Sequence, residues 1–274
     1  MRNNKPLLYS ALGFGGGAFG ALVADLIDFT SARGSVLILI ASTSLWTALF
    51  AALITACLFW AGEIYHRRPG FPFALFLRGL LSGVIAGGIA GALAQIVFIL
   101  PVEPPMLKNL VFKPACWAIM GGCLGWRLST VIPNLGVGRG IIGGLVGGLI
   151  GGVGFIGSQF FVPETLGRML GVGILGAALG LAIVTIESLF RAASLEVIWA
   201  PNEVTSISLG PHPVRIGGGD DHIYVSGLVP GAARVSLDCG KIQYTDSASG
   251  QRTALRAGSR LKIGSIEVVV HAKA

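Results

Sequence analysis

The stretch Arg139-Gly-Ile-Ile-Gly-Gly-Leu-Val-Gly-Gly-Leu-Ile-Gly-Gly152 is apolar apart from its first residue, and half of its positions are glycine. Residues four apart share one face of a helix, so these glycines form two neighbouring rows: Gly140, Gly144, Gly148 and Gly152 in one, and Gly143, Gly147 and Gly151 in the other. A row without side chains lets another helix backbone approach closely, which is how helices associate in lipid. The stretch therefore predicts a closely packed membrane helix.

The composition of the whole chain is that of a membrane protein. Its 274 residues have a mean hydropathy of +0.76, and only 12% are charged, against about a quarter in soluble domains. The net charge of +7 does not indicate nucleic-acid binding, because no basic patch with interleaved aromatic residues is present. The four cysteines have neither the C-x-x-C nor the Cys/His spacing of a metal site, and they do not form a disulfide framework.

Six apolar stretches approach the ~20 residues that cross ~30 Å of hydrocarbon. We predict spans over residues 7–27, 36–61, 74–100, 110–132, 139–162 and 166–190. Lys113, Pro114 and Arg127 shorten the apolar core of the fourth. The first lacks a small-x-small cleavage site, so we expect it to be retained as a span rather than removed as a signal peptide.

Basic residues in the connecting segments set the orientation. One side holds eight of them (Arg2, Lys5, Arg67, Arg68, Arg78, Arg127, Arg139 and Arg191), and the other holds four (Arg33, Lys108, Lys113 and Arg168). The positive-inside rule then places both termini in the cytoplasm. We therefore expect a multi-pass protein of a bacterial inner (plasma) membrane.

An internal repeat accompanies the six spans. Gly16-Gly17-x-x-Gly20-Ala-Leu resembles Gly87-Gly88-x-x-Gly91-Ala-Leu, which predicts three helical hairpins in parallel orientation. Further glycine rows lie at Gly83, Gly87 and Gly91, at Gly121 and Gly125, and at Gly176 and Gly180. Two interpretations are open: packing within one subunit, or a close-packed oligomer around a pore.

Few polar groups fall inside the spans. Asp25 and Gln95 are expected at similar depth, where an ionisable group usually has a function, so they are the candidates for an ion path. Glu63 and Glu187 each precede an arginine by four residues, a spacing that favours an ion pair on a helix. No nucleophile–base pair, phosphate loop or cofactor motif is present, so we expect neither an enzyme nor a cofactor.

The composition changes after about residue 193. Short alternating stretches such as Leu195–Trp199, Val204–Leu209 and Ile266–Val270 are separated by turn residues, which predicts a small β-sandwich. We therefore expect two domains, a transmembrane domain over residues 1–192 and a cytoplasmic all-β domain over residues 193–274.

The tail resembles a forkhead-associated (FHA) domain over residues 194–274. The matching segments are Ile216-Gly217, Asp221-His-Ile-Tyr-Val225, Ala233-Arg-Val-Ser-Leu237, Tyr244-Thr-Asp-Ser-Ala-Ser249 and Gly258-Ser-Arg-Leu-Lys-Ile-Gly-Ser-Ile-Glu-Val268. Glycine-rich spans joined to such a tail resemble bacterial membrane proteins ending in an FHA domain. FHA domains generally bind phosphothreonine peptides through loop residues.

The loop residues that the resemblance would assign to phosphate are missing. The family's arginine falls on Gly218, its Ser-Arg-x-His on Val229-Pro-Gly-Ala232, and its Asn-Gly-Thr on Gln251-Arg-Thr253. Phosphate recognition needs charge-assisted donors such as arginine, which Arg215 and Arg252 alone would supply nearby. We therefore expect a degenerate FHA-like domain whose phosphopeptide site is lost or changed.

Two functions follow from these features. The first is a non-enzymatic scaffold or signalling protein that docks a cytosolic protein partner through the FHA-like tail. The candidate docking residues are Arg215, Gly218, Val229, Gln251 and Arg252. The alternative is an oligomeric channel or transporter subunit whose tail regulates opening.

Overall fold

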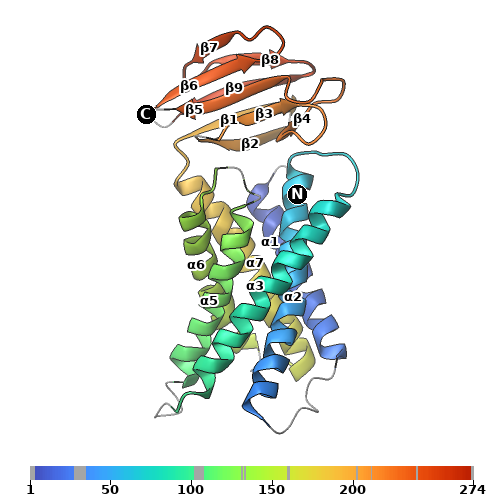
Figure 1. The fold of residues 1–274 in the computed structure, drawn as a ribbon, viewed down its shortest axis with the longest axis vertical. Coiled ribbons are helices and arrows are strands. Elements are labelled where there is room, and N and C mark those ends of the chain that lie inside the picture. Colours follow the sequence, from blue (N-terminus) through green and yellow to red (C-terminus); the bar gives the residue numbers. More distant parts are fainter. Residues whose placement is uncertain are drawn as a thin grey trace.

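A computed structural model describes residues 4–27, 35–101, 108–130, 132, 134–158, 161–201, 203–210, 212–238 and 240–272. Its N-terminal part is helical, and its C-terminal part is a pair of β-sheets that lies against one end of the helices (Figure 1). Arg2 and Arg33, which contribute to the charge count above, lie outside the described residues.

The helices follow the predicted spans closely. They are α1 (Lys5–Leu26), α2 (Val36–Tyr65), α3 (Phe73–Ile99), a π-helical segment η1 (Lys108–Phe112), α5 (Lys113–Leu128), α6 (Val137–Ser158) and α7 (Glu164–Leu189). Local capping explains two of the starts. The side chain of Asn4 accepts from Leu7 N at 3.1 Å, and the Ser35 hydroxyl accepts from Ile38 N at 3.3 Å.

Of the six predicted spans, five are long and apolar enough to cross a membrane within the described part of the chain: α1, α2, α3, α6 and α7. The fourth differs. The predicted span 110–132 is divided between η1 and α5, and α5 has only 16 residues. At 1.5 Å per residue α5 covers about 24 Å, because the helix changes type at Lys113-Pro114.

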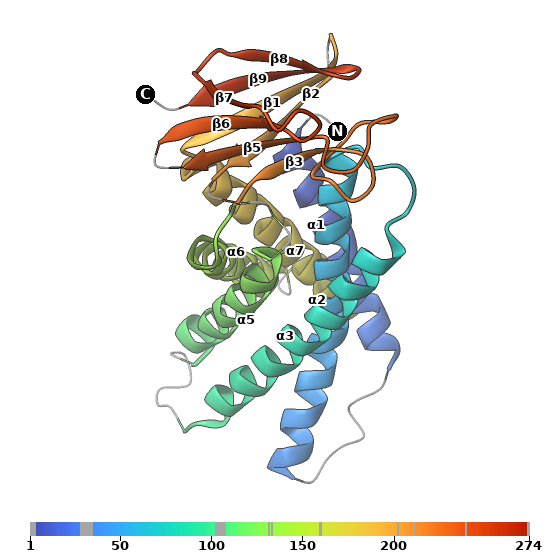
Figure 2. The same ribbon diagram turned by 45° about the horizontal axis from the view of Figure 1, so that its top comes forward.

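The six α-helices form a ring in the order α1–α2–α3–α5–α6–α7, closed by contact between α7 and α1 (Figure 2). Packing is most extensive between α2 and α3 and between α1 and α7, and it is least extensive between α3 and α5. The inside of the ring is filled by fully buried side chains such as Phe50, Leu124 and Leu175.

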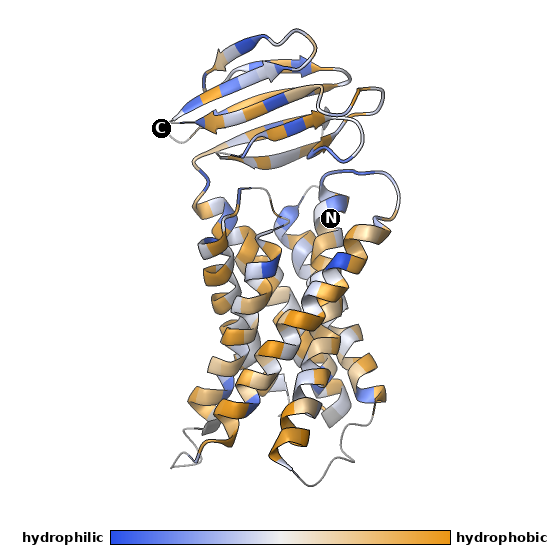
Figure 3. Cartoon of the chain, viewed as in Figure 1, coloured by the Kyte–Doolittle hydropathy of each residue, from blue (hydrophilic) through white to orange (hydrophobic). Residues whose placement is uncertain are grey.

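The outer surface of the ring is apolar along its length (Figure 3). Leu81, Ile85 and Ile89 on α3, for example, are between 52% and 61% exposed. Exposed apolar patches of this extent are rare on soluble proteins, and they mark a surface that contacts lipid or a partner. Together with the five long helices, this surface is that of a membrane protein.

The sheets hold nine strands in the described residues: β1 (Ala193–Ala200), β2 (Glu203–Leu209), β3 (Val214–Gly217), β4 (Ile223–Tyr224), β5 (Ala233–Asp238), β6 (Lys241–Asp246), β7 (Arg252–Leu255), β8 (Arg260–Ile263) and β9 (Ile266–Ala272). One sheet has the order β2-β1-β9-β8, and the other β4-β3-β5-β6-β7. Pairing is antiparallel except between β3 and β4.

Alternation in the strands produces one core shared by both sheets. Leu195, Val197 and Val268 from the first sheet pack with Ile216 and Val235 from the second. Side chains at every second position of a strand point to the same face, so the alternating stretches of the sequence place these residues between the sheets. The predicted β-sandwich is therefore present; its membership of the FHA family is a separate question.

Candidate functional site at the junction of the helices and the sandwich

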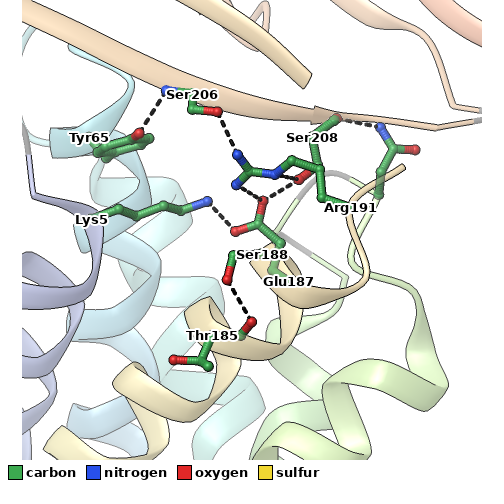
Figure 4. Close-up of polar contacts among 9 residues, drawn as sticks. Lys5, Tyr65, Thr185, Glu187, Ser188, Arg191, Ser206 and Ser208 are labelled. Atoms are coloured by element: carbon green, nitrogen blue, oxygen red, sulfur yellow. Dashed lines mark hydrogen bonds and ion pairs between the residues drawn. The ribbon is translucent and has the colours of Figure 1, made fainter. Parts of the chain in front are cut away.

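A buried carboxylate organises the junction. Glu187, near the end of α7, is 4% exposed and forms ion pairs with Lys5 of α1 at 2.5 Å and with Arg191 at 3.3 Å (Figure 4). Its Oε1 also accepts from the hydroxyl of Ser208 on β2. A buried charge is tolerated only when it is paired and hydrogen-bonded. Glu187 thus joins the first helix, the last helix and the sandwich.

The sequence spacing predicted one of the two ion pairs correctly. Glu187 and Arg191 pair as expected from their separation of four residues. Glu63 does not pair with Arg67 but with Arg68, at 2.7 Å. The reason is that α2 ends at Tyr65 and Arg67 has a φ of +57°, so the helical spacing no longer applies. Arg67 instead pairs with Glu203 of β2 and lies 5.4 Å from the ring of Trp199.

Strand β2 is attached to the helices along much of its length. The Tyr65 hydroxyl accepts from Ser206 N at 2.7 Å, and Arg191 donates to the hydroxyls of Ser206 and Ser208 at 2.6 and 3.1 Å (Figure 4). The side-chain nitrogen of Asn134, between α5 and α6, donates to Ser208 O at 3.0 Å. Hydrogen bonds from three places in the helical part fix the position of one sheet edge.

The turn between β3 and β4 also contacts the helical part. Arg68 donates to the carbonyl oxygen of Asp221 at 2.9 Å and to that of Asp220 at 3.4 Å. Asp221 is buried, and its side chain accepts from Gly231 N, which ties the turn to the next loop. The junction therefore reaches the loops at this end of the sandwich.

A cavity of about 480 Å³ lies beneath this turn. Its charged and imidazole lining consists of four cations, Lys5, Arg68, Arg78 and Arg127, two carboxylates, Glu63 and Asp220, and two histidines, His66 and His222. Burial, and then the nearby charges of Lys5 and Arg68, lower the pKa of His66 from 6.5 to about 3. The pKa of His222 is lowered as well, by burial first and then by Arg215. Both imidazoles are therefore neutral near pH 7, while lysine and arginine keep the lining cationic.

The predicted packing glycines lie where helix backbones meet. Gly83 and Gly87 of α3 face the backbone of α2 around Ala51 and Thr47, and Gly91 faces Thr47 and Ser44. Gly176 and Gly180 of α7 face Gly13 and Tyr9 of α1. A Cβ added to these glycines would meet backbone or side-chain atoms of the neighbouring helix at 3.1 Å or less.

The two glycine rows of α6 contact two different helices of the same chain. Gly140, Gly144 and Gly148 face Gly121, Gly125 and Trp117 on α5, and Gly152 faces Trp117. The second row, Gly143, Gly147 and Gly151, faces Ile183, Leu179 and Leu175 on α7. Both rows thus have partners within one subunit, and a close-packed oligomer stays a prediction that no contact here tests.

Of the five candidate docking residues, Arg215 lies in β3, Arg252 begins β7, and the others lie in loops. Gly218 N donates to Val229 O at 3.2 Å, and Val229 is 70% exposed. Arg215 pairs with Asp221 at 3.4 Å. Gln251 and Arg252 lie across the β6–β7 hairpin, whose turn contacts the same loops because Ser247 N donates to Ala232 O at 3.0 Å. A groove of about 450 Å³ runs between these loops, with Val229, Pro230, Tyr244, Ser247 and Lys262 in its lining. Val229 is the one of the five candidate docking residues that lines this groove.

The two candidates for an ion path are not brought together. Asp25 pairs with Arg168 at 3.0 Å and accepts from the indole nitrogen of Trp46 at 3.4 Å. Gln95 accepts from Thr43 at 3.0 Å and lines a mostly apolar cavity of about 200 Å³ whose lining does not include Asp25. Ion conduction stays a prediction without a contact that joins these two groups.

Sequence reasoning missed several residues of the junction. Tyr65, Asn134, Ser206 and Ser208 are ordinary helix-end, loop and strand residues, and no spacing marks them as partners. The signal that was available is the polar pair Ser206 and Ser208 at alternate positions of a strand, on the side opposite Ile207.

No family model, no curated protein and no solved structure matches the chain.

Proposed function

We propose that this protein is a non-enzymatic scaffold of a bacterial inner membrane, which holds an FHA-like sandwich at the cytoplasmic surface and docks a cytosolic protein partner through it. The observation that carries the proposal is the attachment of β2 and of the β3–β4 turn to helix ends. A sandwich fixed in this way presents its remaining loops in a constant orientation. Pre-orientation reduces the entropy lost on binding.

Two features support the assignment of sides. Lys5 at the start of α1 and Glu187 at the end of α7 are in contact, so the two ends of the helical part lie on the same side. The sandwich lies on this side too, together with Arg67, Arg68 and Arg191. The positive-inside rule assigns that side to the cytoplasm.

The groove between the loops is the proposed docking site. Val229 offers an exposed apolar side chain beside Lys262 and Ser247, a combination that suits an extended protein segment with an apolar anchor. The two-sheet architecture and the parallel β3–β4 pair are compatible with the FHA resemblance. The missing arginine at Gly218 supports a phosphate-independent mode of binding.

The test uses the full chain in nanodiscs. Cross-linking to cytosol followed by mass spectrometry identifies the partner, and titration of that purified partner gives its Kd. We expect Val229→Asp to weaken binding at least about tenfold, since it places a charge at an apolar anchor. Ala257→Asp is the matched control, because Ala257 is exposed at the other end of β7. The docking proposal fails if the two variants bind alike.

A second measurement tests the loss of phosphopeptide recognition. A phosphothreonine peptide library is titrated onto the same nanodiscs by calorimetry. We expect no binder with a micromolar Kd, because Gly218 replaces the arginine that would donate to phosphate. Micromolar binding that disappears on dephosphorylation would show that the phosphate site survives.

A further inference from the structure

The seam between α3 and α5 is the loosest contact in the helical ring. Both cavities described above open along it. The smaller is lined by α2, α3 and α5 away from the sandwich, and the larger by the same helices near the sandwich, with contributions from α1 and the β3–β4 turn. The larger cavity therefore lies where the seam meets the polar end of the helical part.

The positive charges of this larger cavity are only partly compensated. Lys5 is paired with Glu187 and Arg68 with Glu63. Arg78 is exposed, and its guanidinium has no hydrogen-bond or ion-pair partner among the described residues. The guanidinium of the half-buried Arg127 lies 5.5 Å from the ring of Trp126, without a carboxylate partner in the described part of the chain. Two guanidinium groups in one cavity lining are thus available to an anion, and arginine matches phosphate oxygens in geometry.

A third nitrogen-bearing side chain, His66, borders the same cavity. His66 is 9% exposed, and its Nδ1 is buried with no hydrogen-bond partner in the described structure. Because Nδ1 is closed to the cavity, Nε2 is the nitrogen that can donate to a phosphate oxygen there, as the single N–H of a neutral imidazole.

Helix α3 joins this polar end to an apolar wall. Arg78, Leu81, Ser82 and Ile85 all line the cavity and lie on one face of the helix. Leu81 is 57% and Ile85 61% exposed on the outer surface. A ligand that fits both parts has a negatively charged head and apolar chains, in that order along α3.

We propose that this cavity binds the phosphate headgroup of an anionic phospholipid, with its acyl chains lying on α3. Arg78, Arg127 and His66 contact the phosphate, and Leu81 and Ile85 contact the chains. Basic pockets between helices on the cytoplasmic side are a known means of binding such headgroups. The inference rests on the helical part being in a membrane and does not depend on partner docking.

Native mass spectrometry of the full chain in detergent tests the proposal. Phosphatidylglycerol, phosphatidylcholine and inorganic phosphate are titrated separately onto the wild-type protein, and retained lipids are counted. We expect phosphatidylglycerol to bind at least about fivefold more tightly than phosphatidylcholine, and Arg78→Gln and Arg127→Gln each to weaken it about fivefold. Arg139→Gln is the matched control, because Arg139 starts α6 at the same end but does not line the cavity.

Three results would overturn the proposal. Equal retention of both lipids would show that charge is not recognised. Unchanged binding in Arg78→Gln and Arg127→Gln would place the lipid elsewhere. Inorganic phosphate binding that is lost in both arginine variants, while lipid binding is unchanged in them, would identify a free anion as the ligand of the cavity. His66→Phe is a separate test, because phenylalanine is an aromatic residue of similar size without ring nitrogens. We expect this variant to keep its melting temperature and to bind phosphatidylglycerol more weakly.

Discussion

Replacing Gly83 by alanine probes the contact between α2 and α3 directly. A Cβ at this position would lie 2.5 Å from both the carbonyl oxygen of Ala51 and the Cα of Ala52. Ordinary contact begins at 3.4 Å, so the two helices would have to separate by about 1 Å in a close-packed region. Because the atoms in the way belong to the backbone, no side-chain rotation relieves the clash.

Gly88, on the same helix, provides the control position for this substitution. A Cβ there would lie 4.0 Å from the Cβ of Ala48, which is ordinary van der Waals contact. Both alanine substitutions gain roughly 1 kcal/mol of helix propensity, so this term cancels in the comparison. Overpacking costs about 1–3 kcal/mol, and we expect Gly83→Ala to be less stable than Gly88→Ala by about 2–3 kcal/mol.

Thermal unfolding of the detergent-solubilised full chain is the assay. About 2–4 °C per kcal/mol applies to domains of 150–250 residues, so the Gly83→Ala variant should melt about 5–10 °C below the Gly88→Ala variant. Circular dichroism at low temperature checks that both variants are helical. Equal melting temperatures would refute the reasoning, because they would mean that the helices separate by 1 Å without loss of packing energy.

Three further predictions concern the junction. Glu187→Gln leaves Lys5 charged and buried, so we expect it to lower the free energy of unfolding by about 3 kcal/mol or more, as measured by denaturant titration. Tyr65→Phe removes the acceptor of Ser206 N and should lower the free energy of unfolding by about 1–3 kcal/mol. Limited proteolysis should then release the sandwich faster, and an unchanged rate would count against the attachment of β2 to the helices. Because burial lowers the pKa of His66 from 6.5 to about 3, the unfolded chain binds the extra proton between these values. Stability should therefore fall as the pH drops below about 6, by up to about 1.4 kcal/mol per unit, and His66→Gln should remove most of that slope in unfolding experiments at pH 7, 5.5 and 4.5.

Much of the architecture could be predicted because it depends on periodicity. Runs of apolar residues gave the helices to within a few residues, and alternation gave β1, β2 and β9. The fourth span was the exception. The mean hydropathy of the predicted span does not register the change of helix type at Lys113-Pro114. The structure shows a π-helical segment before that point and a shorter α-helix after it. The order of helices in the ring was not predictable, since glycine rows do not specify their partners.

The candidate site was less accessible to sequence reasoning. The junction is built from single residues far apart in the chain, such as Lys5 with Glu187 and Tyr65 with Ser206. No local pattern encodes such pairs. The expected pair of Glu63 and Arg67 was wrong because the end of α2 could not be located to one residue, and one residue decides which arginine the carboxylate meets.

Closure of the ring by α1 and α7 has a consequence for biogenesis. Gly13 and Gly17 on α1 face Gly176 and Val172 on α7, at the opposite end of the helical part of the sequence. Synthesis runs from the N-terminus. The face of α1 that carries Gly13 and Gly17 therefore lacks its partner helix until α7 has been inserted. Insertion and assembly are separate stages for membrane helices. The ring can therefore close only after α7 has been inserted, and the sandwich is the next part of the chain to be synthesised.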